Sequence, residues 1–185
     1  MTDRFVVSPT ALAGVHCIRR KRVGDQRGWL ERLFCSDELA TAGWSWNIAQ
    51  INRTLTRRKG TVRGMHFQHA PHEEAKLVTC LRGEVFDVAV DLRPNSSTYG
   101  RWHGEVLSEA NDTSLLIPPG CAHGFQALSD DVEMLYFHSA PYVAAAEGGV
   151  RPDDPALSII WPMEITEMSD RDRSHPLLND REGKR

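Results

Sequence analysis

The sequence lacks long apolar runs, an excess of basic charge and any cysteine pair of the C-x-x-C type. No window approaches the roughly 18 apolar residues of a membrane-spanning helix, so no membrane partner is expected. A net charge of −3 argues against a nucleic-acid partner, since such domains are usually strongly basic. The cysteines Cys17, Cys35, Cys80 and Cys121 are far apart and are expected to be free thiols. The amino-terminal residues lack a signal-peptide core, so the cytoplasm is the expected location.

Two motifs of cofactor chemistry are also missing. Without a G-x-G-x-x-G fingerprint, no nucleotide redox cofactor is expected. No H-x-H pair occurs either; His66, His69 and His72 follow at intervals of three in a segment that also holds Pro71. We therefore expect no metal. Three histidines could still meet in space, so a metal-dependent enzyme stays open as the alternative.

The length of 185 residues fits one domain, residues 1–185, with room for a real hydrophobic core. From about residue 47 the apolar residues alternate with period two. The segment 84–92 is the best example, because Phe86, Val88 and Val90 fall on one face and Asp87 and Ala89 on the other. Further strands are expected at 76–81, 102–108, 113–117, 121–128 and 132–138, separated by turn residues. This pattern predicts an all-β sandwich or barrel.

Helical signals are confined to the two ends of the chain. Residues 36–42 predict a helix that Ser36 caps and Gly43 ends. From about residue 163 the chain becomes a polar tail, in which we expect a short helix near 167–173 and fraying over the last four or five residues.

His66 and Arg63 are the first candidate site residues. His66 lies on an expected strand between Met65 and Phe67, which therefore face the opposite side. With Arg63 it could line a polar ligand cavity inside a barrel. A core histidine that bonds a backbone carbonyl is the alternative.

Four other residues are chemically suggestive. His123 follows a Pro-x-Gly-x-x-His pattern that resembles the second conserved cupin motif, where the histidine often binds a metal. Lys76 could hold a carbonyl oxygen or a phosphate, or be a solvated strand-edge lysine. Tyr136 could be an acid or a packed aromatic. From the sequence alone, Asp172 is expected to be a surface acid, because it lies in a run of charged residues.

Short motifs run in order through nearly the whole chain. They are Gly24-Asp25-Gln26-Arg27-Gly28, residues 63–68, Lys76-Leu77-Val78, residues 83–93, Ser97-Thr98-Tyr99-Gly100, Ile117-Pro118, Ala122-His123-Gly124-Phe125, Asp154-Pro155, Trp161-Pro162 and Ser169…Asp172…Pro176-Leu177-Leu178. Together they resemble the dTDP-4-dehydrorhamnose 3,5-epimerase family of dTDP-L-rhamnose biosynthesis. The resemblance implies a metal-free, homodimeric isomerase with a cupin-type antiparallel β-barrel (jelly roll) and a few short helices. The implied substrate is a nucleotide-linked 4-keto-6-deoxy sugar.

The resemblance also assigns roles to residues. It implies that His66 is the general base, Asp172 its partner, Tyr136 the proton donor and Lys76 the stabiliser of the oxyanion. The implied substrate-binding residues are Arg27, Glu31, Gln50, Asn52, Arg63, His123, Tyr142 and Glu147. Because the N-terminal strands are exchanged in the implied dimer, Arg27 is expected to reach the nucleotide of the neighbouring subunit.

These residue types suit the chemistry. C3 and C5 of a 4-keto sugar are acidic because the anion spreads onto O4, and inversion needs a base on one face and an acid on the other. Histidine titrates near neutral pH, and a carboxylate fixes its tautomer. The alternatives are an epimerase of C3 alone, a 3,4-ketoisomerase and a binding module without activity.

Overall fold

Antiparallel strands dominate the computed structural model, which describes residues 3–182. The strands are β1 (Phe5–Pro9), β2 (His16–Arg20), β3 (Val23–Asp25), β4 (Gly28–Leu30), β5 (Gln50–Thr56), β6 (Val62–Gln68), β7 (Lys76–Arg82), β8 (Glu84–Asp91), β9 (Trp102–Ser108), β10 (Thr113–Ile117), β11 (Cys121–Ala127), β12 (Val132–His138) and β13 (Glu147–Gly149). The helical elements are α1 (Ser36–Leu39), α2 (Asp170–Ser174), α3 (Leu178–Glu182) and the 3₁₀ turns η1 (Ala40–Ala42) and η2 (Ala144–Ala146). This confirms the all-β prediction with a few short helices.

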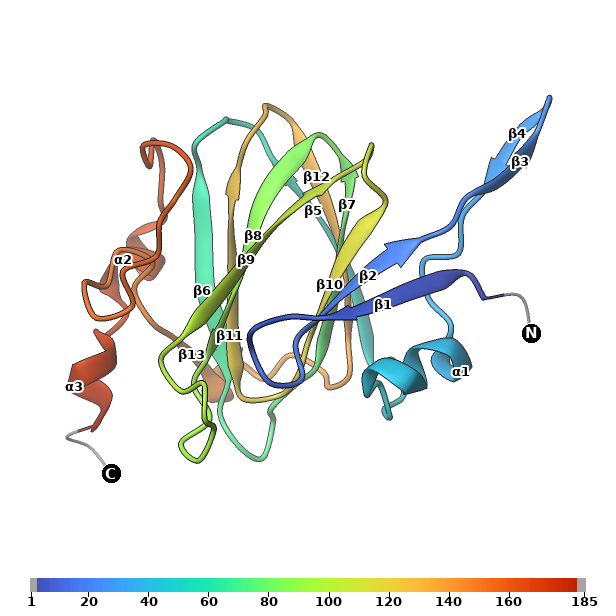
Figure 1. The fold of residues 1–185 in the computed structure, drawn as a ribbon. Helices are drawn as coiled ribbons and strands as arrows, with labels where there is room; N and C mark the ends of the chain where they lie inside the picture. The colour runs from blue at the N-terminus through green and yellow to red at the C-terminus, as the bar shows by residue number, and fades with distance from the viewer. Residues whose placement is uncertain (1–2, 183–185) are drawn as a thin grey trace.

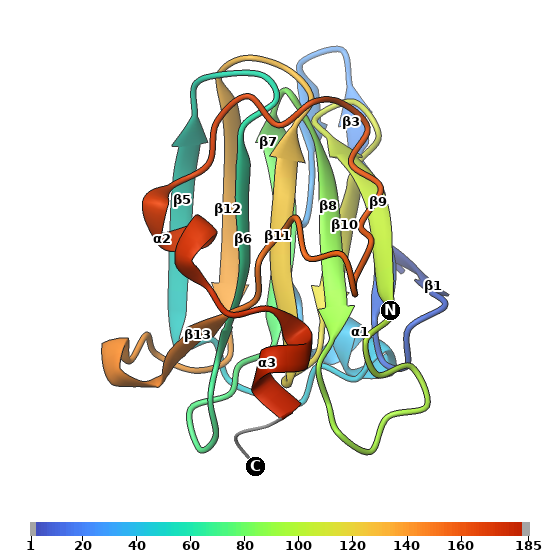
Figure 2. The ribbon, with the colours of Figure 1, turned by 90° about the vertical axis from the view of Figure 1, so that its left-hand side faces the viewer.

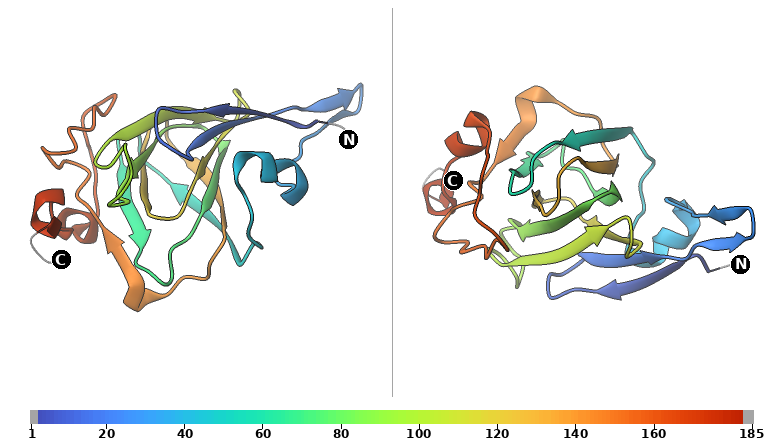
Figure 3. Two further views of the ribbon diagram at one scale, coloured as in Figure 1. Left: turned by 60° about the horizontal axis from the view of Figure 1, so that its bottom comes forward. Right: turned by 90° about the horizontal axis from the view of Figure 1, so that it is seen from above.

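Two sheets face each other and enclose the barrel interior (Figures 1 and 3). One has six strands in the order β1-β2-β10-β7-β12-β5, and the other has five in the order β13-β6-β11-β8-β9. Neighbours in both sheets pair antiparallel, as in the ladder of β8 with β11. Because alternate side chains point to opposite faces, each strand presents one set of residues to the interior and another to the outside.

Parts of the outer faces of both sheets are covered, which explains why several strands are apolar on both sides. Residues 150–182, the C-terminal segment, cross the outer face of the five-stranded sheet (Figure 2). Leu157 and Leu178 of this segment pack there against Met65, Val88 and Val90. A separate cluster packs α1 and Trp44 against the six-stranded sheet. Apolar burial outside the barrel, at about 1.5–3 kcal/mol per large side chain, leaves part of the interior free for polar groups.

The expected strands and the N-terminal helix are broadly confirmed, with one correction. Helix α1 and turn η1 span residues 36–42, and Gly43 ends them with φ at 90°. Ser36 is not the cap, however, because Cys35 occupies the N-cap position and makes no side-chain cap bond. The Ser36 hydroxyl instead lies 3.4 Å from Asp37 Oδ1.

The sequence interpretation missed several terminal elements. Strands β1 to β4, strand β13 and helix α3 were not predicted, whereas α2 overlaps the expected tail helix but begins three residues later and ends one residue later. The expected fraying reaches residues 183–185, which lie outside the described residues. All four cysteines are free, two of them buried and two half-buried. No helix in the described part of the chain is long and apolar enough to cross a membrane.

An irregularity in β6 places Arg63 and His66 on the same cavity wall. Residues three apart on a regular strand face opposite sides. Here His123 pairs with His66 and Phe125 with Arg63, so three steps on β6 match two on β11. Gly64 lies at this bulge with φ at 129°, and a Cβ there would stand 2.5 Å from the Gly124 backbone. The bulge therefore requires glycine and turns both polar side chains inward.

Candidate active site

A cavity of about 950 Å³ opens between the two sheets. All four residues predicted to be catalytic line it, namely His66, Lys76, Tyr136 and Asp172. Three of the predicted binding residues also line it, namely Asn52, Arg63 and His123. The cavity brings together residues that lie more than 100 positions apart in the sequence.

His66 and Asp172 form a hydrogen-bonded pair. His66 Nε2 lies 2.7 Å from Asp172 Oδ1, and Gly64 N donates to Asp172 Oδ2 at 3.1 Å. Helix α2 fixes the carboxylate, because the Ser169 hydroxyl accepts a bond from the Asp172 amide at the N-cap. Asp172 is therefore not the surface acid that its charged surroundings suggested, since its side chain is only 3% exposed.

The Asp172 carboxylate stays ionised at neutral pH. Burial alone would raise its pKa, but the His66 hydrogen bond and charge, with the Gly64 amide, lower the pKa to about 2. Arg171 Nη2 also lies 3.0 Å from His66 Nε2, although one ring nitrogen cannot both donate to a carboxylate and accept from a guanidinium. We assign the proton on Nε2 to the shorter carboxylate contact, which leaves Nδ1 as the free nitrogen.

Tyr136 and Lys76 come from the other sheet, on β12 and β7. The Tyr136 side chain is buried; burial raises the pKa of its phenol, and the hydroxyl lies 3.4 Å from Thr54 Oγ1. Lys76 Nζ donates to the His66 carbonyl at 3.2 Å and pairs with Glu74 Oε1 at 3.1 Å. Lys76 is thus not a solvated edge residue, and an ammonium group is held inside the cavity.

His123 has a carboxylate partner of its own. Its Nε2 lies 2.8 Å from Asp87 Oδ2, and both side chains are buried. The His123 and Tyr136 ring centroids are 6.0 Å apart. Sequence reasoning did not assign Asp87, although its place on the polar face of β8 was a usable signal.

One end of the cavity is rich in arginine. Arg57, Arg58 and Arg63 line it, and Arg63 Nη1 reaches the Thr56 hydroxyl at 3.4 Å. A guanidinium group can donate two parallel hydrogen bonds to the oxygens of one phosphate. Only Arg63 was predicted; the other two lie in an ordinary-looking turn that gave no signal of a site.

Three predicted binding residues form a chain at the cavity rim. Gln50 Oε1 accepts from the Tyr142 amide at 3.0 Å, and the Tyr142 hydroxyl donates to Glu147 Oε2 at 3.0 Å. Glu147 in turn accepts from Arg171, a cavity residue that sequence reasoning missed. The three are thus linked to the cavity but do not line it.

Arg27 and Glu31 lie outside the cavity of their own chain. Arg27 sits between β3 and β4, a hairpin that projects away from the barrel (Figure 1), with its side chain 90% exposed and paired to Asp25. Glu31 bonds Arg20 Nε at 2.8 Å. Their roles in substrate binding stay predictions, and Arg27 is predicted to act in the cavity of a second copy of the chain.

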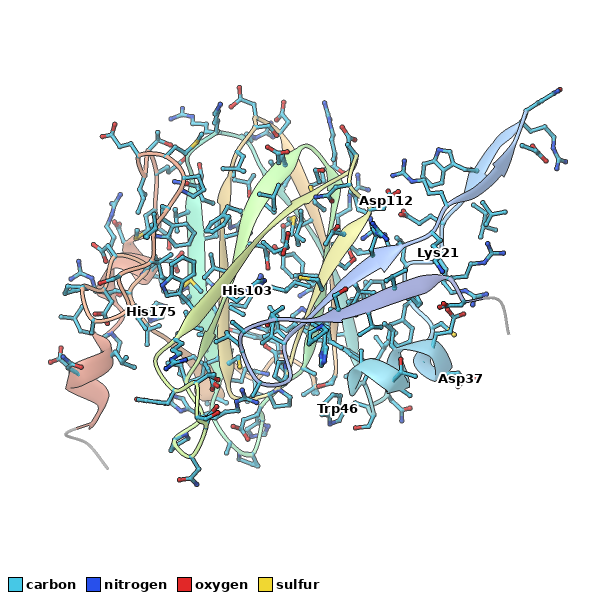
Figure 4. All side chains as sticks on the ribbon, viewed as in Figure 1. Lys21, Asp37, Trp46, His103, Asp112 and His175 are labelled. Atoms are coloured by element: carbon cyan, nitrogen blue, oxygen red, sulfur yellow. The ribbon has the colours of Figure 1, made fainter. Side chains whose placement is uncertain are left out.

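Two groups of metal-capable side chains occur among residues 3–182. His66, Asp172 and His175 form one, with ligand atoms within 4.8 Å of one another, and Cys17, His103 and Glu105 form the other. Figure 4 labels His175 at the C-terminal segment and His103 on β9. His123, the histidine of the cupin-like motif, is in neither group. In the first group, His66 and Asp172 already bond each other.

Comparisons with known proteins agree with this geometry. Residues 9–180 match the sequence profile described as dTDP-4-dehydrorhamnose 3,5-epimerase. A protein of that name from Sinorhizobium fredii is 40% identical over 177 residues, which cover 95% of this chain and 91% of the relative. A dTDP-4-dehydrorhamnose 3-epimerase from Streptomyces niveus is 41% identical over 171 residues, covering 92% of this chain and 82% of the relative.

A solved structure adds a bound ligand. The crystal structure of dTDP-6-deoxy-D-glucose-3,5-epimerase from Legionella pneumophila, in complex with dTDP-4-keto-L-rhamnose, has a TM-score of 0.89 and 36% identity. The match covers 95% of this chain and 93% of the other. By its sequence, its barrel and the residues gathered in its cavity, the chain belongs to the dTDP-4-dehydrorhamnose 3,5-epimerase family and is an isomerase.

Proposed function

We propose that the protein inverts C3 and C5 of a dTDP-linked 4-keto-6-deoxy sugar by proton transfer across the cavity. The observation that carries the proposal is that His66 and Tyr136 line the cavity from two facing sheets. The carboxylate-held His66 stands on the five-stranded sheet, and the buried Tyr136 stands on the six-stranded sheet. A sugar ring between them has a base on one face and an acid on the other, as inversion requires.

The reaction proceeds through an enolate. The free nitrogen of His66 takes the proton from C3, and the electrons of the C–H bond move through the C3–C4 bond onto O4. Lys76 donates to the developing O4 charge, an interaction typically worth about 3–4 kcal/mol in an oxyanion hole. Tyr136 gives its proton to the enolate from the other side. Solvent then returns a proton to Tyr136 and accepts the one on His66, so that the same base can act at C5.

The arginine-rich end of the cavity supports a nucleoside diphosphate. Arg57, Arg58 and Arg63 place three positive charges at one end, against the two phosphates of such a substrate. The sugar then extends toward Tyr136 and Lys76. In a low-dielectric cavity, these charges hold the diphosphate more firmly than they would in water.

Proton NMR in D₂O tests the proposal. With dTDP-4-keto-6-deoxyglucose as substrate, the C3 and C5 proton signals are both expected to disappear as deuterium replaces them. Loss of the C3 signal alone would instead support a 3-epimerase, the activity named for the Streptomyces niveus relative. Retention of both signals would contradict the proposal.

Tyr136→Phe is expected to separate proton removal from inversion. The phenylalanine ring fills the same space but has no proton to give, so solvent exchange at C3 persists while net inversion slows about 100-fold. The two rates can be measured in one NMR time course. Their joint loss would mean that the phenol acts before the enolate forms.

We also propose a homodimer in which the β3–β4 hairpin reaches the neighbouring subunit. Val23, Trp29 and Leu30 on this hairpin are 46%, 59% and 63% exposed, an unusual concentration of apolar surface. The projection of Arg27 at its tip supports delivery of a guanidinium to the partner's cavity. The free thiols suit a reducing compartment, so we propose action in the cytoplasm.

Leu30→Asp is expected to shift the protein from dimer to monomer. Burying a charge in an apolar interface is costly unless it is paired, so the mass measured by light scattering should halve. Ile160→Asp is the matched control, because Ile160 is 76% exposed on the C-terminal segment, away from the hairpin. An unchanged mass for Leu30→Asp, or an equal effect of both variants, would refute this interface.

A further inference from the structure

His138 is a cavity residue to which neither the sequence nor the proposed mechanism gives a role. It ends strand β12, two residues after Tyr136, and lines the same cavity. Its side chain is 11% exposed, and its ring lies 6.1 Å from the Tyr136 ring, at 25° between the planes. Because residues two apart on a strand share a face, Tyr136 and His138 belong to one wall.

Glu74 orients the His138 ring. Its Oε2 lies 2.9 Å from His138 Nδ1, and its Oε1 lies 3.1 Å from Lys76 Nζ. Burial alone would raise the pKa of Glu74, but the bond from His138 and the charge of Lys76 lower it. An ionised carboxylate at this position fixes the ring orientation and holds the proton on Nδ1, which is the role of the carboxylate in hydrolase triads.

The other ring nitrogen remains available to a ligand. His138 Nε2 lies 3.4 Å from Asn52 Nδ2, too long for a strong hydrogen bond, and this amide has to turn away when Nε2 carries a proton, because both groups are then donors. Asn52 itself lines the cavity, so Nε2 lies at the cavity surface. His138 with Glu74 thus repeats the arrangement of His66 with Asp172, on the opposite sheet.

We propose that His138, oriented by Glu74, is a second proton donor to the enolate, so that Tyr136 and His138 each serve one of the two inverted carbons. This inference rests on the proposed function. The enolate electrons form the new C–H bond, the Nε2–H bond of the imidazolium breaks, and neutral imidazole remains. Solvent water then returns a proton to His138 and accepts the one that His66 removed.

The placement of the two donors fits this division. Alternate residues on a strand are about 6.6 Å apart along its axis, so the two acids reach different positions on a sugar ring. Lys76 pairs with His138 in the ladder of β7 and β12, which puts the O4-stabilising ammonium beside the second donor. One base on the facing wall can serve both carbons, because both flank the same carbonyl.

The test follows C3 and C5 separately in His138→Gln, which keeps the polarity of the side chain but cannot donate as an imidazolium. Inversion at one carbon is expected to slow at least 10-fold more than at the other, while exchange with D₂O continues at both. His72→Gln is the matched control, because His72 is exposed outside the cavity. Glu74→Gln also removes the ion pair with Lys76, so it is expected to slow both carbons, but the carbon that His138 serves more strongly; it replaces His138→Gln if that variant does not fold.

The outcomes distinguish the two proposals. Wild-type spectra report on the proposed function, since failure to invert both carbons contradicts it whatever the variants do. If the wild type inverts both carbons, equal slowing at C3 and C5 in His138→Gln would overturn the second-donor role. A higher KM with unchanged inversion rates would also overturn it, because His138 would then only bind the sugar.

Discussion

Replacing His66 by Asn is expected to lower kcat by about 1,000-fold or more, because His66 is the group proposed to remove the C3 and C5 protons. General base catalysis contributes roughly 100- to 10,000-fold, and here proton removal starts the whole reaction. The amide of Asn can keep a hydrogen bond to Asp172 but does not accept a proton near neutral pH. Solvent exchange at both carbons should stop together with inversion, which distinguishes this variant from Tyr136→Phe.

The fold should survive this change. The His66 side chain is 26% exposed and belongs to none of the hydrophobic clusters, so thermal unfolding should move by only a few degrees. His72→Asn provides a control with the same substitution outside the cavity. Turnover near that of the wild type in His66→Asn would remove the base assignment.

Asp172→Asn is expected to reduce kcat about 100- to 1,000-fold with little change in KM. Asn cannot stabilise the imidazolium that forms when His66 accepts a proton, and its amide group can turn the ring to the wrong tautomer. Asp170→Asn is the matched control, because Asp170 lies on the same helix but is fully exposed. Equal activity of the two variants would mean that Asp172 has no part in catalysis.

The same pair of variants tests a pH-dependent contribution to stability. The folded-state pKa of Asp172 is lowered to about 2 from its ordinary value of 3.8. A lowered pKa stabilises the fold above the unfolded-state value, and this stabilisation is lost as the pH falls from about 4 to about 2. The destabilisation of Asp172→Asn relative to the wild type should therefore be full at pH 5 and shrink toward pH 3 in denaturant titrations.

Local patterns in the sequence were enough for the strands and for several of the chemical groups. The alternation in residues 84–92 predicted β8. The position of His66 between two apolar residues correctly predicted that His66 faces the cavity while Met65 and Phe67 face the opposite side of the strand. These features depend on neighbouring residues, since side chains of a strand alternate whatever it pairs with. The order of the motifs along the chain identified Asp172 as a candidate catalytic residue, although the charged residues around it in the sequence suggested a surface acid.

The sequence by itself thus determined an all-β chain with its strand positions and a set of groups suited to proton transfer. Only the tertiary structure decided which partners those groups have, such as Asp87 for His123 and Glu74 for His138. It also decided that the bulge at Gly64 turns Arg63 and His66 to one wall, and that the C-terminal segment covers the apolar face of β8. The physical reason is that pairing register and sheet coverage arise from contacts between distant segments, whereas alternation and turn chemistry are local.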